Sequence, residues 1–152
     1  MTQYILCSSP FGALLIGWDT DGVVSVRLTS ESPQENPSNS MIHPVATQLQ
    51  EYFSGIRKDF DLTLAPKGTP FQKLVWRELT NIPYGQTRTF GEIAAAIGKP
   101  GAARAVGMAC NRNPIWLLIP CHRVVGRNGA LTGYAGGLDM KCKLLELEQE
   151  YV

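Results

Sequence analysis

The sequence carries little charge and no long run of apolar residues. Asp, Glu, Lys and Arg make up 18% of its 152 residues, and the formal net charge is +1. No apolar stretch is long enough to span a membrane, and we find no basic segment ahead of an apolar one near the start, as a secretory signal would require. Hydrophobic residues reach 44%, which excludes global disorder and suits one compact unit or two small ones sharing a core.

Cysteine is also scarce, and no two cysteines form a C-x-x-C pair. The set is too small for a disulfide scaffold. We therefore expect a reducing, cytoplasmic setting, in which a single cysteine can be kept for chemistry. The four cysteines are Cys7, Cys110, Cys121 and Cys142.

The small net charge hides a difference between the two parts of the chain. Residues 1–65 have a net charge of −4, and residues 66–152 have a net charge of +5. The C-terminal part is therefore the better partner for a polyanion such as a nucleic acid. Ordinary surface charge explains the same numbers equally well, so charge alone does not decide between the two.

The first 65 residues have the pattern of a small unit of strands with one helix, because alternating and apolar stretches are separated by turn residues. The predicted elements are strands over 4–19 and 22–30, a hairpin turn at Asp21-Gly22, an exposed Pro-rich loop over 31–44, a helix over 45–56 that stops at Gly55, a strand over 59–64 and a linker over 65–68.

The remaining residues have the pattern of a helical unit. Two Thr-x-x-Gln/Glu capping boxes mark helix starts, at Thr69 and at Thr89. Helix, glycine-containing turn and helix give the outline of a helix-turn-helix, which many helical pairs share. The predicted elements are a helix from 70 with an apolar face of Phe71, Leu74, Val75 and Leu79, a turn over 82–86, helices over 90–98 and 102–113, a buried apolar segment over 116–119, glycine-rich turns over 127–137 and an amphipathic helix over 138–150.

Cys121 is the candidate nucleophile. A thiol reacts well only as a thiolate, so it needs a base or a positive charge nearby. His122 and Arg123 follow it directly, and a turn after Pro120 could bring the imidazole close or connect it through a water. Glu148 follows the apolar pair 144–145 at helical spacing and can face inward to orient the imidazole. The alternative is a buried inert cysteine beside a surface histidine, which is the commoner meaning of a Cys-His dipeptide.

The longer string around this cysteine resembles a known family. In chain order, the characteristic strings are IPYGQ, ARAVG, IPCHRVV, GALTGYAGGL and KLLELE. Together they closely resemble the O6-alkylguanine-DNA alkyltransferases, also called methylated-DNA–protein-cysteine methyltransferases. The resemblance is strong over residues 69–152 and rests only on length and pattern before them. It implies an α+β fold with a small N-terminal sheet-plus-helix, ribonuclease-H-like support domain at 1–65. A helical domain at 66–152, with a winged-helix-like helix-turn-helix, would bind DNA and accept the alkyl group.

The resemblance also implies roles for individual residues. Cys121 accepts the alkyl group, His122 is its base through a water, and Glu148 holds the imidazole. Asn113 braces the turn that carries the cysteine, and Arg104 enters the base stack where the damaged nucleotide has left. The implied substrate-binding residues are Tyr134, Phe90, Ala135, Gly136, Lys141 and Val124. The implied DNA-binding residues are Arg104, Ala103, Gly107, Arg112 and Thr89, with Lys73, Arg77, Arg88, Lys99 and Arg127 as further candidate phosphate contacts.

Three departures from the family pattern limit what is carried over. Many members have tyrosine where this chain has Phe90, which cannot donate a proton to the leaving guanine. Ala135 replaces a residue whose hydroxyl faces the substrate oxygen in some members, although its backbone N–H could still serve. Some members hold zinc in the N-terminal domain, but Cys7 and His43 alone are too few for a four-ligand site. We expect no metal and no cofactor.

The implied function is direct-reversal DNA repair. The O6-alkyl group of guanine in double-stranded DNA would pass irreversibly to Cys121, once per molecule, after nucleotide flipping from the minor-groove side. The small side chains of residues 101–109 suit a thin helix that reads no particular sequence. We expect a monomer. Three alternatives are a catalytically silent DNA-binding relative, a helix-turn-helix transcription factor, and a cysteine hydrolase using Cys121, His122 and Glu148.

Overall fold

The computed structural model describes residues 2–30 and 43–152. The chain divides into two compact units, Met1–Pro66 and Lys67–Val152. The exposed loop expected over 31–44 lies almost wholly outside the described residues. Among those residues, no helix combines the length and the apolar character that crossing a membrane would need.

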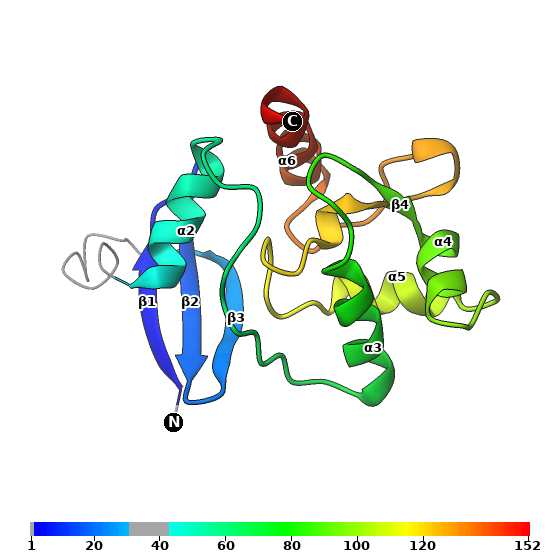
Figure 1. Cartoon of the computed structure of the whole chain (residues 1–152), viewed down its shortest axis with the longest axis horizontal. Helices are drawn as coiled ribbons and strands as arrows, with labels where there is room; N and C mark the ends of the chain where they lie inside the picture. The colour runs from blue at the N-terminus through cyan, green and yellow to red at the C-terminus, as the bar shows by residue number, and fades with distance from the viewer. Residues whose placement is uncertain (1, 31–42) are drawn as a thin grey trace. The chain divides into compact units, whose positions relative to one another are not determined.

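The first unit contains a three-stranded antiparallel sheet in the order β1-β2-β3, with helix α2 beside it (Figure 1). Asp19 pairs with Gly22, so Thr20 and Asp21 form the hairpin loop, one residue earlier than the predicted turn. Gly22 has a φ of 139°, and a Cβ there would lie 2.5 Å from the Thr63 carbonyl oxygen, so both backbone and space require glycine. The elements are β1 (Gln3–Cys7), β2 (Ala13–Asp19), β3 (Gly22–Thr29) and α2 (Pro44–Phe53).

The helix predicted in this unit is confirmed, and the strand predicted after it is wrong. Helix α2 ends just before Gly55, which has a φ of 80°. Residues 59–64 form no strand, and within the described part of the chain a single isolated parallel bridge joins Leu64 to Val23. The alternation is present, but none of these six residues is buried. Without a buried face, the pattern provides no packing that would hold a full ladder.

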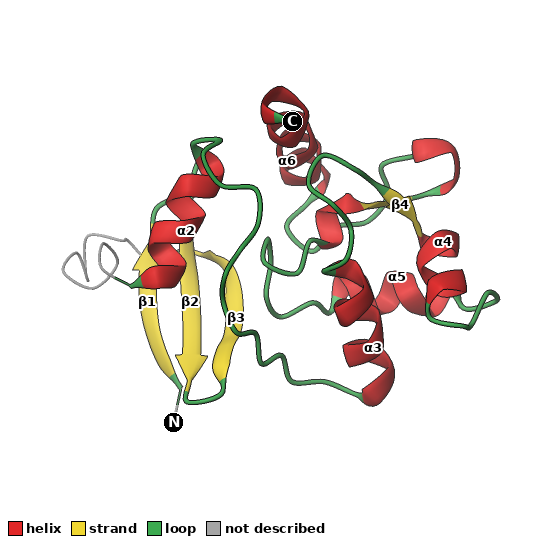
Figure 2. Ribbon diagram, viewed as in Figure 1, coloured by secondary structure: helices red, strands yellow, loops and turns green. Residues whose placement is uncertain are grey.

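The second unit is mainly helical, as predicted (Figure 2). Helices α3, α4 and α5 contact one another, and strands β4 and β5 pair in parallel. The helices are α3 (Pro70–Leu79), α4 (Phe90–Ala96), α5 (Ala103–Asn111) and α6 (Leu138–Tyr151), the strands are β4 (Arg88–Thr89) and β5 (Val124–Val125), and the 3₁₀ turns are η2 (Cys121–Arg123) and η3 (Arg127–Gly129).

Both predicted capping boxes are confirmed. The Gln72 N–H donates to Thr69 Oγ1 at 3.1 Å, and the Thr69 N–H donates to Gln72 Oε1 at 3.0 Å. The corresponding distances are 3.0 and 2.8 Å for Glu92 and Thr89. Each box satisfies two backbone donors that would otherwise be unpaired, so α3 and α4 begin where the sequence predicts.

The buried face of α3 differs in part from the prediction. Val75 and Leu79 are buried as expected, whereas Phe71 and Leu74 are only half-buried. Trp76 is buried instead, and its indole Nε1 donates to the Ala109 carbonyl at 2.9 Å. This bond ties α3 to α5, the helix that forms one wall of the site described next.

Candidate active site

Cys121 lies in a buried turn that follows a buried apolar segment. Leu117, Leu118 and Ile119 are buried, as the sequence predicts, whereas Trp116 at the start of the predicted buried segment is only half-buried. The Cys121 N–H then donates to the Ile119 carbonyl at 2.8 Å, and the chain enters the 3₁₀ turn η2. Cys121 itself is 3% exposed. The thiol is therefore held by the fold and shielded from bulk solvent.

Asn113 is in contact with the thiol and with the turn that carries it. Its side-chain Nδ2 donates to the Ile119 carbonyl at 2.9 Å and to Cys121 Sγ at 3.2 Å. Its Oδ1 accepts from the Ile115 N–H at 2.9 Å. One buried amide thus fixes both ends of the apolar segment and gives the sulfur a hydrogen-bond donor.

His122 and Glu148 form a buried pair. His122 Nε2 and Glu148 Oε2 are 2.7 Å apart, and both residues are fully buried. An ionised carboxylate only accepts hydrogen bonds, so we assign the imidazole proton to Nε2. Among the described residues, His122 Nδ1 has no hydrogen-bond partner. The alternative of a surface histidine beside the cysteine is wrong.

Arg123 is a buried member of this group whose position the sequence does not predict. Its Nε donates to Glu148 Oε1 at 2.9 Å, and its Nη2 donates to Glu148 Oε2 at 3.0 Å. Its Nη1 donates to the Ile82 carbonyl at 2.7 Å, and its guanidinium lies 5.6 Å from the centre of the Tyr84 ring. The two bonds to the carboxylate form a fork that fixes its orientation.

Burial and neighbouring groups set the charge states in this group. Burial raises the pKa of Cys121 to about 11, although the Asn113 hydrogen bond and the Lys141 ammonium oppose the rise. Burial lowers the pKa of His122, and Glu148 opposes that shift. Burial works against ionised Glu148, but bonds and charges from His122 and Arg123 lower its pKa to about 2. At neutral pH the resting site holds a thiol, a neutral imidazole and a carboxylate.

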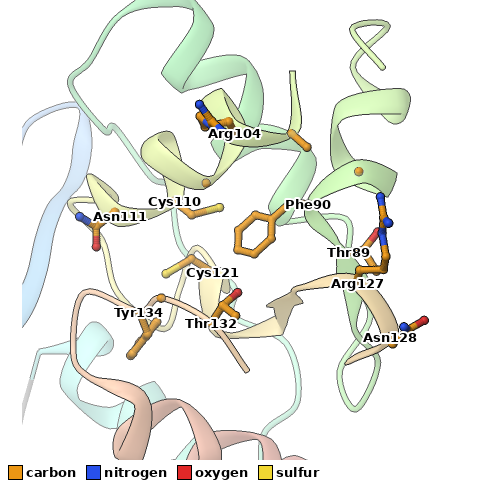
Figure 3. Close-up of a pocket in the computed structure, with 14 residues that line it drawn as sticks. Thr89, Phe90, Arg104, Cys110, Asn111, Cys121, Arg127, Asn128, Thr132 and Tyr134 are labelled. Atoms are coloured by element: carbon orange, nitrogen blue, oxygen red, sulfur yellow. The ribbon is translucent and has the colours of Figure 1, made fainter. Parts of the chain in front are cut away.

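A cavity of about 810 Å³ opens onto Cys121. Figure 3 shows the side chains of Cys121, Cys110 and Phe90 near one another, with Arg104 on α5 to one side. Tyr134 also lines the cavity, and its buried hydroxyl has no hydrogen-bond partner among the described residues. The predicted residues that line the cavity are Thr89, Phe90, Ala103, Arg104, Gly107, Cys121, Arg127 and Tyr134. Gly133, which opens the GYAGG loop that the resemblance places at the base pocket, also lines it. The remaining lining residues, for which the sequence implies no role at the site, are Gly91, Cys110, Asn111, Asn128 and Thr132.

Several residues implied to bind substrate or DNA do not line this cavity, namely Ala135, Gly136, Lys141, Val124 and Arg112, together with the candidate phosphate contacts Lys73, Arg77, Arg88 and Lys99. Ala135 and Arg112 are exposed. Lys141 is fully buried, and its ammonium group donates hydrogen bonds to the carbonyls of Val124, Thr132 and Gly133. The same ammonium group lies 5.8 Å from the centre of the Phe90 ring. Lys141 therefore ties residues 132–133, which line the cavity, to β5.

Comparison with known proteins identifies the family to which this chain belongs. Residues 70–150 match the family described as "6-O-methylguanine DNA methyltransferase, DNA binding domain", and residues 2–66 match its "ribonuclease-like domain". The chain belongs to the 6-O-methylguanine DNA methyltransferase family. The resemblance and the α+β fold inferred from the sequence are confirmed.

Members of this family with similar sequences can be aligned with almost the whole chain. The methylated-DNA–protein-cysteine methyltransferase of Methanosarcina acetivorans is 49% identical over 151 residues, covering 95% of this chain and 97% of that protein. The crystal structure of Mycobacterium tuberculosis O6-methylguanine methyltransferase has a TM-score of 0.87 at 42% identity, covering 100% of this chain and 95% of that one. A structure of the Mycobacterium tuberculosis protein in complex with DNA has a TM-score of 0.86 at 42% identity, covering 98% and 94%.

Proposed function

We propose that this protein repairs DNA by moving the O6-alkyl group of guanine onto Cys121. The thiolate sulfur attacks the alkyl carbon, the carbon–O6 bond breaks, and guanine leaves with the electron pair. The observation that carries the proposal is the position of Cys121. This cysteine lines the cavity, its sulfur accepts a hydrogen bond from Asn113, and the next residue, His122, is paired with the buried Glu148. Family membership supports the same reaction.

His122 is the base in this proposal. A buried thiol with a raised pKa needs a proton acceptor before it can attack. Nδ1 is the imidazole atom that Glu148 leaves available, and a water between Nδ1 and the sulfur would carry the proton. Glu148 then stabilises the imidazolium that forms, as the acidic member of a catalytic triad does. Because Phe90 has no hydroxyl, we assign protonation of the leaving guanine to water.

We further propose that the protein acts on double-stranded DNA as a monomer in the cytoplasm. A base inside a duplex cannot reach a buried thiol, so the nucleotide must be extruded into the cavity. Helix α5 carries Ala103, Arg104 and Gly107 along the cavity, and its small residues suit close approach to a minor groove. Arg104 would fill the gap left in the stack, because a planar guanidinium can stack on bases. Residues 67–152 would bind the DNA, and the first unit would support them.

The thioether formed on Cys121 is stable, and none of the described residues around this site is placed to remove the alkyl group. Each molecule therefore reacts once. With excess duplex containing O6-methylguanine, we expect one lesion removed per protein molecule and none by Cys121→Ala. Continued removal beyond one equivalent would contradict the proposal. Turnover of a small ester or amide without DNA would favour a cysteine hydrolase instead.

Substitution of Arg104 tests nucleotide flipping separately from alkyl transfer to Cys121. Arg104→Ala should slow repair of duplex DNA by at least about tenfold, a loss of roughly 1.4 kcal/mol of transition-state stabilisation, and leave the reaction with free O6-benzylguanine nearly unchanged. Arg57→Ala, in the first unit and paired with Glu51, is the matched control and should change neither rate. Equal losses on both substrates for Arg104→Ala would remove Arg104 from the flipping role.

A further inference from the structure

A second thiol shares the cavity with the alkyl-accepting cysteine, and the mechanism proposed above does not use it. Cys110 lies in the last turn of α5 and Cys121 opens η2, so the two come from different elements. Both line the same cavity, and their side chains lie near each other in Figure 3. They are 7% and 3% exposed, respectively. No disulfide joins them in this structure.

Asn113 connects the two cysteines directly. Its backbone N–H donates to the Cys110 carbonyl at 3.2 Å, and its side-chain Nδ2 donates to Cys121 Sγ at 3.2 Å. A single residue thus binds the backbone of one cysteine and the sulfur of the other. Burial raises the pKa of both thiols, and the Lys141 ammonium partly offsets the rise at each. The two thiols therefore share the influence of one cation, and Asn113 joins the backbone of Cys110 to the sulfur of Cys121.

We propose that Cys110 and Cys121 form a dithiol modification site that a hydroperoxide converts to a disulfide. Cys121 gives up its thiol proton and the thiolate attacks the terminal oxygen of the peroxide. The O–O bond breaks, and the departing oxygen takes up that proton, which leaves a sulfenic acid on Cys121 and releases water or an alcohol. The Cys110 sulfur then attacks the Cys121 sulfur, the S–O bond breaks, and hydroxide leaves with the Cys110 proton as water. Two thiols are oxidised and one peroxide is reduced.

The disulfide would protect the Cys121 thiol, which can accept an alkyl group only once. Further oxidation of a sulfenic acid to a sulfinic acid is irreversible in almost all proteins, whereas a disulfide is reversed by thiols. Capture of the Cys121 sulfenic acid by Cys110 would preserve the acceptor through oxidation and return it on reduction. This consequence rests on the proposed alkyl transfer, but formation of the cross-link does not.

The cross-link is measured by mass spectrometry without any DNA. The full chain is treated with hydrogen peroxide, blocked with a thiol reagent, and digested with trypsin under non-reducing conditions. We expect residues 105–112 and 113–123 joined as one peptide that thiol reductant separates. The unlinked peptide 113–123 bearing only sulfinic acid, or a link between the Cys121 residues of two molecules, would overturn the proposal.

A second readout uses the fraction of repair activity that thiol reductant restores, with each variant normalised to its own untreated activity. Cys142→Ser is the matched control, because Cys142 is a half-buried cysteine on α6 outside this cavity. The parent and Cys142→Ser should regain most activity, and Cys110→Ala and Cys110→Ser should each regain several-fold less. Equal recovery by Cys110→Ala and the parent would contradict the proposal. If the cross-link forms but no variant repairs DNA, the proposed function fails and the dithiol site stands.

Discussion

At the scale of single residues, Glu148 is shared between two side chains that are neighbours in the sequence. His122 takes one carboxylate oxygen, and the guanidinium of Arg123 bonds to both. Side chains of adjacent residues on a strand point to opposite faces, which is why adjacency alone predicts no shared partner. In a 3₁₀ turn the step is about 120° per residue, so both side chains can reach α6.

This geometry explains which site residues the sequence could predict. Cys121, His122 and Asn113 follow from the resemblance, and the inward position of Glu148 also follows from helical spacing with Leu144. The burial of Arg123 depends on a turn type that no sequence pattern announces. Cys110 is one helical residue among several, and only the fold, which places α5 and η2 along the same cavity, brings it there.

We expect Arg123 to lower the pKa of His122 as well as to orient the Glu148 carboxylate. Its positive charge lowers the pKa of His122, so Arg123→Gln should raise that pKa. Because the base must be neutral, the rate is lost as pH falls through this pKa. The acid limb of the pH–rate profile with free O6-benzylguanine should therefore move to higher pH.

Arg123→Lys is the control for this prediction, because it keeps the charge and loses the two-bond fork. It should lower the rate while leaving the acid limb close to its original position. Identical pH profiles for the parent and Arg123→Gln would show that the charge of Arg123 does not reach His122.

At the scale of secondary-structure elements, the helix starts were predictable and one strand was not. A capping box is a local interaction within four residues, so the sequence contains all of its participants. The stretch 59–64 has the alternation of a strand, but strand formation depends on a partner and a buried face elsewhere in the fold. Neither is visible in the segment itself, and the structure shows a single bridge.

The two capping boxes allow a matched test of stability against function. Thr69→Ala and Thr89→Ala should each lower the free energy of unfolding by about 1 kcal/mol, measured by urea denaturation. Only Thr89 lines the cavity, directly before Phe90. We therefore expect Thr89→Ala to slow duplex repair and Thr69→Ala to leave it nearly unchanged. Equal effects of both variants on repair would mean that Thr89 acts only through stability.

At the scale of the whole molecule, a buried ionised group makes stability depend on pH. The pKa of Glu148 falls from an ordinary value of 4.5 to about 2 in the folded chain. The stabilisation this shift provides is therefore complete above about pH 4.5 and is lost as pH falls through about 2, with a magnitude of roughly 3 kcal/mol.

Glu148→Gln should therefore be less stable than the parent at neutral pH and should lose less stability between pH 4.5 and 2. Thermal unfolding across this range measures both effects. Glu146→Gln, an acid on the same helix that lies outside the buried pair, is the control and should follow the parent. Parallel curves for the parent and Glu148→Gln would contradict a depressed Glu148 pKa.

The most direct test of the account is a peptide mass map after reaction with a duplex that contains O6-methylguanine. We predict that the tryptic peptide 113–123, which holds Cys121, gains the mass of one methylene group in proportion to the lesions removed. The peptide 105–112, which holds Cys110, should stay unmodified. Methylation of any other residue, or loss of the lesion with no change in the protein, would contradict alkyl transfer to Cys121.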